Sequence, residues 1–240
     1  MAKNKENKTG DVLDVPVQDT KTKVDVSDIT SKIDIESFFD KNKKIVFILL
    51  GVVVLVSGAF VGYKYMAGAQ DEDAQKEIFI AENYFQRDSF DLALNGDKVN
   101  RGFIDIADEY SLSKTATLCN FYIGAIYLKK GKFEEAIEYL KKFNSKDLLI
   151  QARAYALTGD AYLELKDYDN AISYYKKASD YEPNEFFTPR YLLKLGMAYE
   201  INKDFEGAAK AYSIIETDYS KSSEFNDARK YRARAEAMKE

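Results

Sequence analysis

One spacing of small and aromatic residues occurs three times in this chain and limits the folds available to it. In the middle copy, Gly159 is followed by Tyr162, Ala171 and Tyr175, and Pro183 closes the segment. Two antiparallel helices approach closely only where small side chains lie at their crossing, so Gly159 and Ala171 must stay small while the tyrosines fill the space beside them. Proline ends the second helix because it lacks a backbone N–H and clashes with the preceding turn. The segment therefore predicts a helical hairpin.

The same spacing recurs on both sides of this hairpin. Copies begin at Gly124 and Gly196, 35 residues before and 37 residues after Gly159, close to the period of roughly 34 residues that is typical of the tetratricopeptide repeat (TPR). A fourth, weaker copy begins at Ala81 and stays in register only if residues 95–100 are an insertion. Since each hairpin needs neighbours to cover its apolar face, the copies predict an all-α TPR-type solenoid of about four helix pairs. The expected repeats are about 74–111, 117–150, 152–185 and 189–221, followed by a polar capping helix over 222–239.

An uncharged apolar run of 19 residues, 45–63, precedes the repeats. As an α-helix it would span about 28 Å, close to the hydrocarbon thickness of about 30 Å of a bilayer. A core helix would be apolar on one face only. A cleaved signal peptide is the rival interpretation, because Ala67-Gly68-Ala69 has the pattern of a cleavage site. The length of the run and of the segment before it favours a single uncleaved transmembrane helix.

Charges beside this run predict its orientation. Four lysines lie within twenty residues before the run and two within twenty residues after it; they are Lys32, Lys41, Lys43 and Lys44, then Lys64 and Lys76. The positive-inside rule therefore places the N-terminus in the cytoplasm. The predicted organisation is a disordered cytoplasmic tail over 1–44, the span over 45–63, a linker over 64–73 and an extracytoplasmic TPR domain over 74–240, which in a bacterium is periplasmic.

Three glycines of the run, Gly51, Gly58 and Gly62, fall on one helical face. The last two form a Gly-x-x-x-Gly pair, which allows another membrane helix to approach closely. We therefore expect transmembrane packing at these positions. Glycine is also common in membrane helices that make no such contact.

The composition excludes several classes of function. The chain has no histidine and a single cysteine, Cys119, so it lacks the pairs used for Ser-His or Cys-His catalysis and the usual zinc ligands. A free cysteine within a helix is most often a buried structural residue. The net charge of −5 argues against nucleic acid as a partner. We predict a protein that is not an enzyme and has no catalytic residues, metal or cofactor.

In a TPR array the first helix of each pair lines a concave groove, which holds a peptide or a partner's helix. Helical spacing predicts the groove-facing residues, and the apolar ones are expected to receive a segment of another protein. Packing of the same side chains against this chain's own helices is the alternative. The apolar set is Ile78, Phe85, Leu118, Phe121, Leu128, Leu163, Leu193 and Met197, with Glu82, Ala125, Arg153, Ala156, Asp160, Arg190 and Glu200 on the same faces.

Several motifs resemble the YfgM-like family of membrane-anchored TPR proteins. They are AENYFQ and FDLALNG near the start of the repeats, GFIDIADEYS after them, and the closing AYSIIETDYSKS. The resemblance covers residues 35–240. It implies an inner-membrane ancillary subunit of the bacterial Sec translocon that assists the folding of secreted proteins. The implied partners are translocon subunits, a membrane-anchored prolyl isomerase and secreted clients.

Two other functions remain open at this point. A structural envelope scaffold for outer-membrane or cell-wall assembly would share the anchor and the repeats. Outer-membrane lipoproteins of that kind need a cysteine just after the signal, and Cys119 lies far from it. An enzyme is the third possibility, and the chain shows no phosphate-binding loop, catalytic pair or metal-ligand set that would support it.

Overall fold

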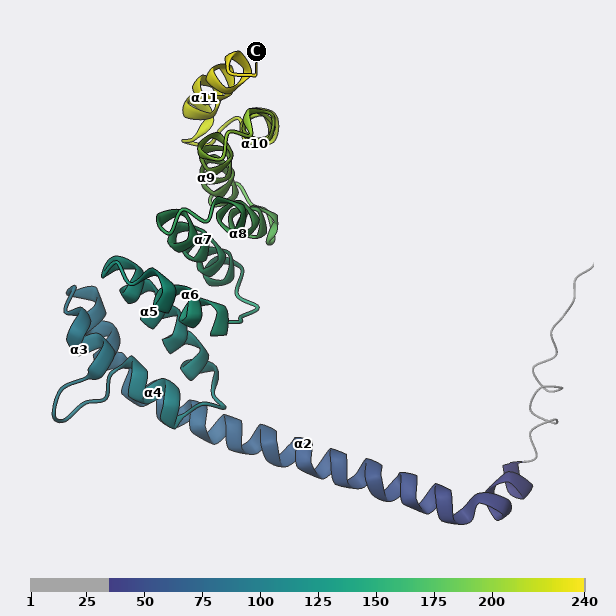
Figure 1. Cartoon of the computed structure of the whole chain (residues 1–240). Helices are drawn as coiled ribbons and strands as arrows, with labels where there is room; N and C mark the ends of the chain where they lie inside the picture. The colour runs from purple at the N-terminus through teal and green to yellow at the C-terminus, as the bar shows by residue number, and fades with distance from the viewer. Residues whose placement is uncertain (1–34, 240) are drawn as a thin grey trace, which may run out of the picture. The chain divides into compact units, whose positions relative to one another are not determined.

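The computed structural model describes residues 35–239, and every regular element in this range is an α-helix (Figure 1). The all-α fold predicted from the sequence is thus confirmed. The tail prediction for residues 1–34 lies outside the described range. The helices are α2 (Ile35–Gln86), α3 (Phe90–Asn95), α4 (Phe103–Glu109), α5 (Lys114–Lys129), α6 (Phe133–Lys142), α7 (Leu148–Glu164), α8 (Tyr168–Asp180), α9 (Thr188–Ile201), α10 (Phe205–Asp218) and α11 (Phe225–Ala237).

The chain divides into two units, residues 1–59 and residues 60–240. In the first unit, α2 bends at Asn42, whose backbone angles (φ −117°, ψ 16°) are not helical. Beyond the bend the helix carries the apolar run, and none of its most apolar window is buried within this chain. By length and composition, α2 is able to cross a membrane.

Two segments of α2 differ from the predicted boundaries. Residues 35–44, assigned to a disordered tail, and residues 64–73, assigned to a linker, are both helical. The second segment contains Ala, Gln, Asp and Glu and no proline, so nothing interrupts the helical hydrogen bonds there. The apolar run and the first helix of the repeats are therefore one continuous helix after the bend.

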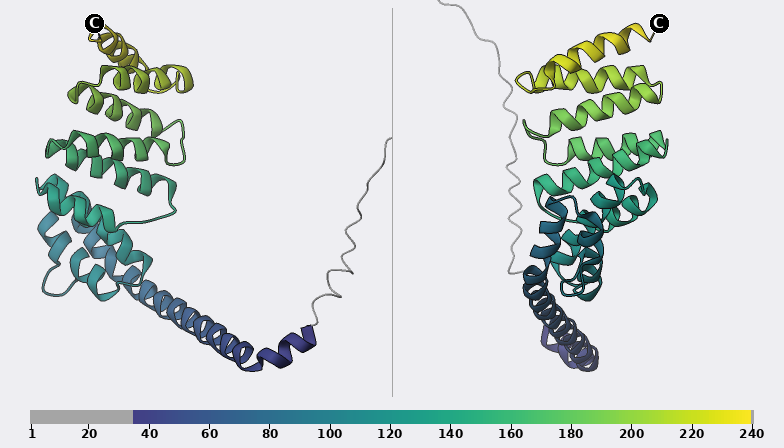
Figure 2. Two further views of the ribbon diagram at one scale, coloured as in Figure 1. Left: turned by 45° about the vertical axis from the view of Figure 1, so that its right-hand side comes forward. Right: turned by 90° about the vertical axis from the view of Figure 1, so that its left-hand side faces the viewer.

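In the second unit, consecutive helices pack in antiparallel pairs, and each pair packs on the next (Figure 2). The pairs are α5 with α6, α7 with α8, and α9 with α10. The end of α2 packs with α3 and α4 around Ala74, Ile78 and Ala81, which are buried. The charged helix α11 closes the other end of the stack, because Ala228 and Ala235 lie buried against α10 while most of its remaining residues are exposed.

The same turn joins the two helices of all four pairs. A residue in the left-handed region ends the first helix: Asp88, Gly131, Lys166 or Lys203, with φ between 55° and 71°. The backbone N–H of the next residue then donates to the carbonyl oxygen of the repeat tyrosine five residues earlier, at 2.9 Å in each case. These tyrosines are Tyr84, Tyr127, Tyr162 and Tyr199. The common bond is a Schellman-type helix end, and its presence at Tyr84 relates the weak first repeat to the other three.

The small residues of the repeat lie at the helix crossings. A Cβ added to Gly159 would come within 2.8 Å of the Tyr175 ring, and one added to Gly196 within 2.6 Å of Cζ of Tyr212. The alanine of each crossing, such as Ala171, has no exposed surface. Bulkier side chains here would force the paired helices apart.

The second helix of the first pair is broken between α3 and α4. The break is a loop over residues 96–102, where the repeat spacing requires an insertion. Asp97 organises this loop: its carboxylate accepts hydrogen bonds from Tyr84 Oη (2.7 Å), from the backbone N–H groups of Val99 (2.6 Å) and Asn100 (2.7 Å), and from Asn100 Nδ2 (3.0 Å). These bonds, the backbone bond of Asn100 first among them, hold the pKa of Asp97 well below its usual value.

A polar contact joins the third and fourth pairs. The Asp160 carboxylate on α7 accepts from Tyr175 Oη of α8 (2.7 Å) and from Lys194 Nζ of α9 (2.6 and 2.7 Å). Burial, and then the Asp160 charge, raise the pKa of Tyr175 far above its ordinary value. Tyr175 is therefore a hydrogen-bond donor at every physiological pH, and the three side chains connect successive pairs.

Candidate functional site

The strongest candidate for a binding site is a cavity of about 420 Å³ on the first helices of the repeats. Seven of its twelve lining residues come from α2 and α5, and the rest from α7, α9 and the residue just before α9. We call this cavity the apolar groove. Its lining residues are Glu82, Phe85, Gln86, Leu118, Phe121, Tyr122, Ala125, Leu149, Ile150, Arg153, Phe187 and Tyr191.

Aromatic rings make the floor of the apolar groove. Phe85 of α2 meets Tyr122 of α5 with ring centroids 5.1 Å apart, and Tyr122 stacks on Phe103 of α4 at 4.8 Å. Phe121 contacts Tyr122 at 5.7 Å and Phe143, the residue after α6, at 5.4 Å. Because these rings also fill the core, the floor is rigid and is formed before any ligand arrives.

Two charged side chains interrupt the apolar wall. The guanidinium carbon of Arg153 lies 5.9 Å from the centre of the Phe121 ring, within cation–π range. Glu82 is half-buried on α2. Burial first, and then the Glu82 carboxylate, raise the pKa of Tyr122 to about 12, whereas Arg153 acts in the opposite direction. Both charges therefore act on the same tyrosine of the floor.

The predicted groove residues are divided among several places. Phe85, Leu118 and Phe121 come together in the apolar groove, as do Glu82, Ala125 and Arg153. Leu128 and Leu163, with Asp160, line a separate cavity of about 440 Å³ near the other ends of α5 and α7. That cavity is more open and includes the charged Lys129 and Glu164.

The remaining predicted residues lie outside both cavities. Ile78 belongs to the core between α2 and α5 and is 7% exposed. Leu193 packs against the buried cluster of the last two pairs, and Ala156 packs with Tyr191. Met197 is 44% exposed on α9. Arg190 forms an ion pair with Glu224, just before α11, and Glu200 forms one with Arg234 on α11.

Helical spacing alone did not indicate six residues of the groove. These are Gln86, Tyr122, Leu149, Ile150, Phe187 and Tyr191. A signal was present for part of this set: Leu148-Leu149-Ile150 and Phe186-Phe187 are apolar runs in or beside connecting segments, where exposed apolar side chains are unusual. Leu149 is 50% exposed and Phe186 is 81% exposed, so the apolar surface extends past the groove.

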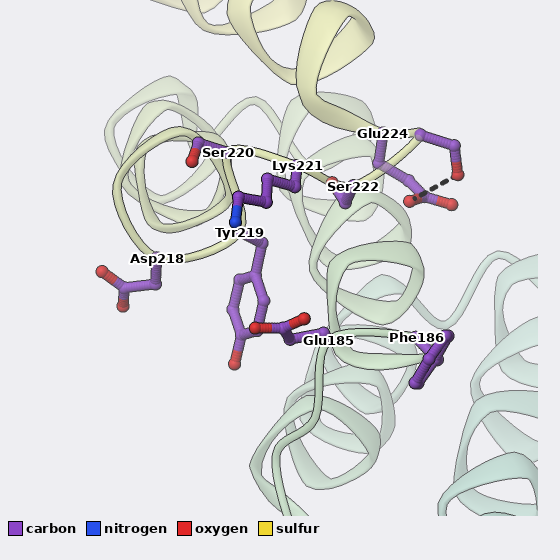
Figure 3. Close-up of a pocket in the computed structure, with 9 residues that line it drawn as sticks. Glu185, Phe186, Asp218, Tyr219, Ser220, Lys221, Ser222 and Glu224 are labelled. Carbon is purple, nitrogen blue, oxygen red and sulfur yellow. Dashed lines mark hydrogen bonds between the residues drawn. The ribbon is translucent and has the colours of Figure 1, made fainter.

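A third cavity, of about 370 Å³, lies between the α8–α9 connection and the segment joining α10 to α11 (Figure 3). Its lining is mostly polar, with three serines, Lys221 and the carboxylates of Glu185, Asp218 and Glu224. Ser223 Oγ donates to Glu224 Oε2 at 2.9 Å. Its two aromatic side chains, Phe186 and Tyr219, lie among these polar and charged groups, so the cavity is less suited to an apolar segment.

Cys119 and the glycines of the span complete the predicted positions. Cys119 is fully buried on α5, and burial raises the pKa of its thiol to about 12, so the thiolate is not available near neutral pH. A Cβ at Gly51, Gly58 or Gly62 would meet nothing within 4 Å. Packing of another helix on those glycines stays a prediction. Within residues 35–239, no three His, Cys, Asp or Glu side chains are grouped to hold a metal ion.

Comparison with known proteins supports the reading of the helix pairs. Residues 121–185 match the model of the tetratricopeptide repeat. This segment runs from the middle of α5 to the connection between α8 and α9, and it includes Phe121 and Arg153. The chain is also 29% identical over 144 residues to the uncharacterized protein ycf37 of Guillardia theta, an alignment that covers 58% of this chain and 73% of that protein. The second unit therefore contains a TPR helical repeat region.

Proposed function

We propose that this protein is a non-enzymatic, membrane-tethered TPR scaffold whose apolar groove holds a segment of a partner protein. The observation that carries the proposal is the aromatic floor of the groove, built by Phe85, Phe121 and Tyr122 on first helices of neighbouring repeats. TPR arrays are protein-interaction modules, and a preformed concave apolar site is the usual place for a partner's side chains.

Because the groove is tethered to a membrane, weak apolar contacts are enough to hold a partner protein. A groove fixed to a membrane meets partners in the same membrane at a high effective concentration. Contacts that would be too weak in free solution can then hold a complex together. Release is also fast, which suits a scaffold that handles many clients.

We further propose that α2 crosses the inner membrane of a bacterium with its N-terminus in the cytoplasm and the TPR region in the periplasm. The excess of lysines before the apolar run supports this orientation. The resemblance to the YfgM-like family supports translocon subunits, a membrane-anchored prolyl isomerase and secreted clients as partners. Protease added to intact spheroplasts should then degrade the TPR region, and protection of that region would contradict the orientation.

The test is to identify the neighbours of the full-length tagged protein in mild detergent by mass spectrometry. Leu149→Asp places a charge in the groove wall, and Ile201→Asp is the matched control, because the two side chains are 50% and 48% exposed and Ile201 lies outside the groove. We expect translocon subunits with the wild type and the control, and their loss with Leu149→Asp. Recovery of outer-membrane or cell-wall machinery alone would instead support an envelope scaffold. Equal recovery by both variants would refute binding in the groove.

A further inference from the structure

The apolar groove contains two charges that have no ion-pair partner among the described residues, Arg153 on α7 and Glu82 on α2. Several other charged side chains of the first helices are paired: Glu77 pairs with Arg101 at 3.0 Å, and Lys194 with Asp160 at 2.6 Å. Arg153 instead lies over the Phe121 ring. A guanidinium presents five N–H donors that suit a carboxylate, so Arg153 is an unmatched cation beside an apolar floor.

Both charges border the aromatic floor. The guanidinium carbon of Arg153 lies 5.9 Å from the centre of the Phe121 ring, whose centroid is 5.7 Å from that of Tyr122, and both Arg153 and Glu82 act on Tyr122. Since α5 carries both rings, while α7 carries the cation and α2 the anion, a segment laid on the rings has both charges beside it.

We propose that Arg153 selects an acidic side chain, and Glu82 a basic one, on an amphipathic helical segment whose apolar face rests on Phe121 and Tyr122. This inference rests on the proposed function and adds the chemistry of the partner. An acidic and a basic side chain of the segment would each meet an opposite charge, whereas like charges would be repelled. The partner is therefore an amphipathic helix that carries an acidic and a basic residue beside its apolar face.

The experiment uses the full-length protein in lipid nanodiscs to select from a phage-displayed library of random peptides about 16 residues long, with empty nanodiscs removing peptides that bind lipid. We expect enriched peptides to combine large apolar residues with Asp or Glu. The bait Arg153→Glu should shift the enrichment from acidic to basic residues at that position. The matched control bait is Arg229→Glu on the exposed face of α11, which changes the net charge equally and should keep the acidic preference.

An enriched peptide and its Glu→Lys counterpart are then compared by fluorescence anisotropy. Wild-type protein should bind the acidic peptide at least about fivefold more tightly, and Arg153→Glu should reverse the order. Glu82→Gln should reduce the preference for the basic residue of the peptide. Enrichment of apolar peptides without any charge preference, or the same shift with Arg229→Glu, would overturn the charge selection while leaving the groove as a binding site. Absence of any enriched peptide would overturn both proposals.

Discussion

Replacing Gly196 by alanine tests whether the helix crossing is as close as the structure places it. The added Cβ would lie 2.6 Å from Cζ and 2.8 Å from Cδ1 of the Tyr212 ring. Tyr212 has no exposed surface and packs among Ala171, Ala208 and Ile215. An aromatic ring enclosed in this way has little room to move, so either the ring or the helix must shift.

The expected size follows from two opposing effects. Overpacking a filled core costs about 1–3 kcal/mol, while alanine favours the helix over glycine by about 1 kcal/mol. The net loss in free energy of unfolding is therefore about 1 kcal/mol, which lowers the melting temperature by about 2–4 °C in a domain of this size. Tyr212→Leu removes the ring, so in the double variant the extra methyl group should cost nothing and the two effects should not add.

The measurement is urea and thermal unfolding of the full-length chain in detergent micelles, followed by circular dichroism at about 222 nm. Gly68→Ala is the control, because that helical glycine has no atom within 4 Å of an added Cβ, and its substitution should leave stability unchanged or slightly higher. The close crossing would be refuted if Gly196→Ala were as stable as the wild type, or if its loss added fully to that of Tyr212→Leu.

Three further predictions concern single side chains. Asp160→Asn should lower the free energy of unfolding by about 1–2 kcal/mol, since it weakens charge-assisted hydrogen bonds between two helix pairs. The control is Asp180→Asn, which removes a charge from an ion pair whose side chains are both 61% exposed. It should cost less than about 0.5 kcal/mol in the same urea titration. Because the pKa of Asp97 in the folded protein lies well below its ordinary value, its carboxylate stabilises the fold above that ordinary value, and the contribution is lost as the pH falls through the folded pKa. Asp97→Asn should therefore show a smaller loss of stability than the wild type between neutral and acidic pH, and an unchanged acid sensitivity would contradict the role of the loop carboxylate. Cys119 should resist a maleimide reagent in the folded protein and react after unfolding. The cysteine of the control variant Ser223→Cys, at an exposed position, should react at once. Labelling is measured as a mass shift, and rapid reaction of Cys119 in the folded protein would contradict its burial.

Much of the fold could be predicted from the sequence because its determinants are local. Gly159, Ala171 and Tyr175 mark a helix crossing by their sizes alone, and the same spacing around Gly124 and Gly196 indicates repetition. The helical state of residues 64–73 was missed because a domain boundary was assumed to be a break in structure. No residue there interrupts a helix, so α2 passes from the apolar run into the repeats without one.

The candidate site was predicted in part. Phe85, Leu118 and Phe121 were placed in one groove by helical spacing, which is a property of single helices. Phe187 and Tyr191 could not be found in that way, because they reach the groove from a connection and from the next repeat. Leu128 and Leu163 lie on the predicted helices but in a second cavity, since position along a helix decides which cavity a residue reaches.

The sequence by itself determined the apolar run, the all-α class and the repeat, because hydrophobic length and the size of crossing residues act between neighbours in the chain. Only the tertiary structure decided that Arg153 lies over Phe121 and that Glu82 acts on Tyr122. Those relations join side chains 32 and 40 positions apart and depend on the angle between successive pairs. That angle is set by the summed packing of buried side chains from several helices, which no local spacing specifies.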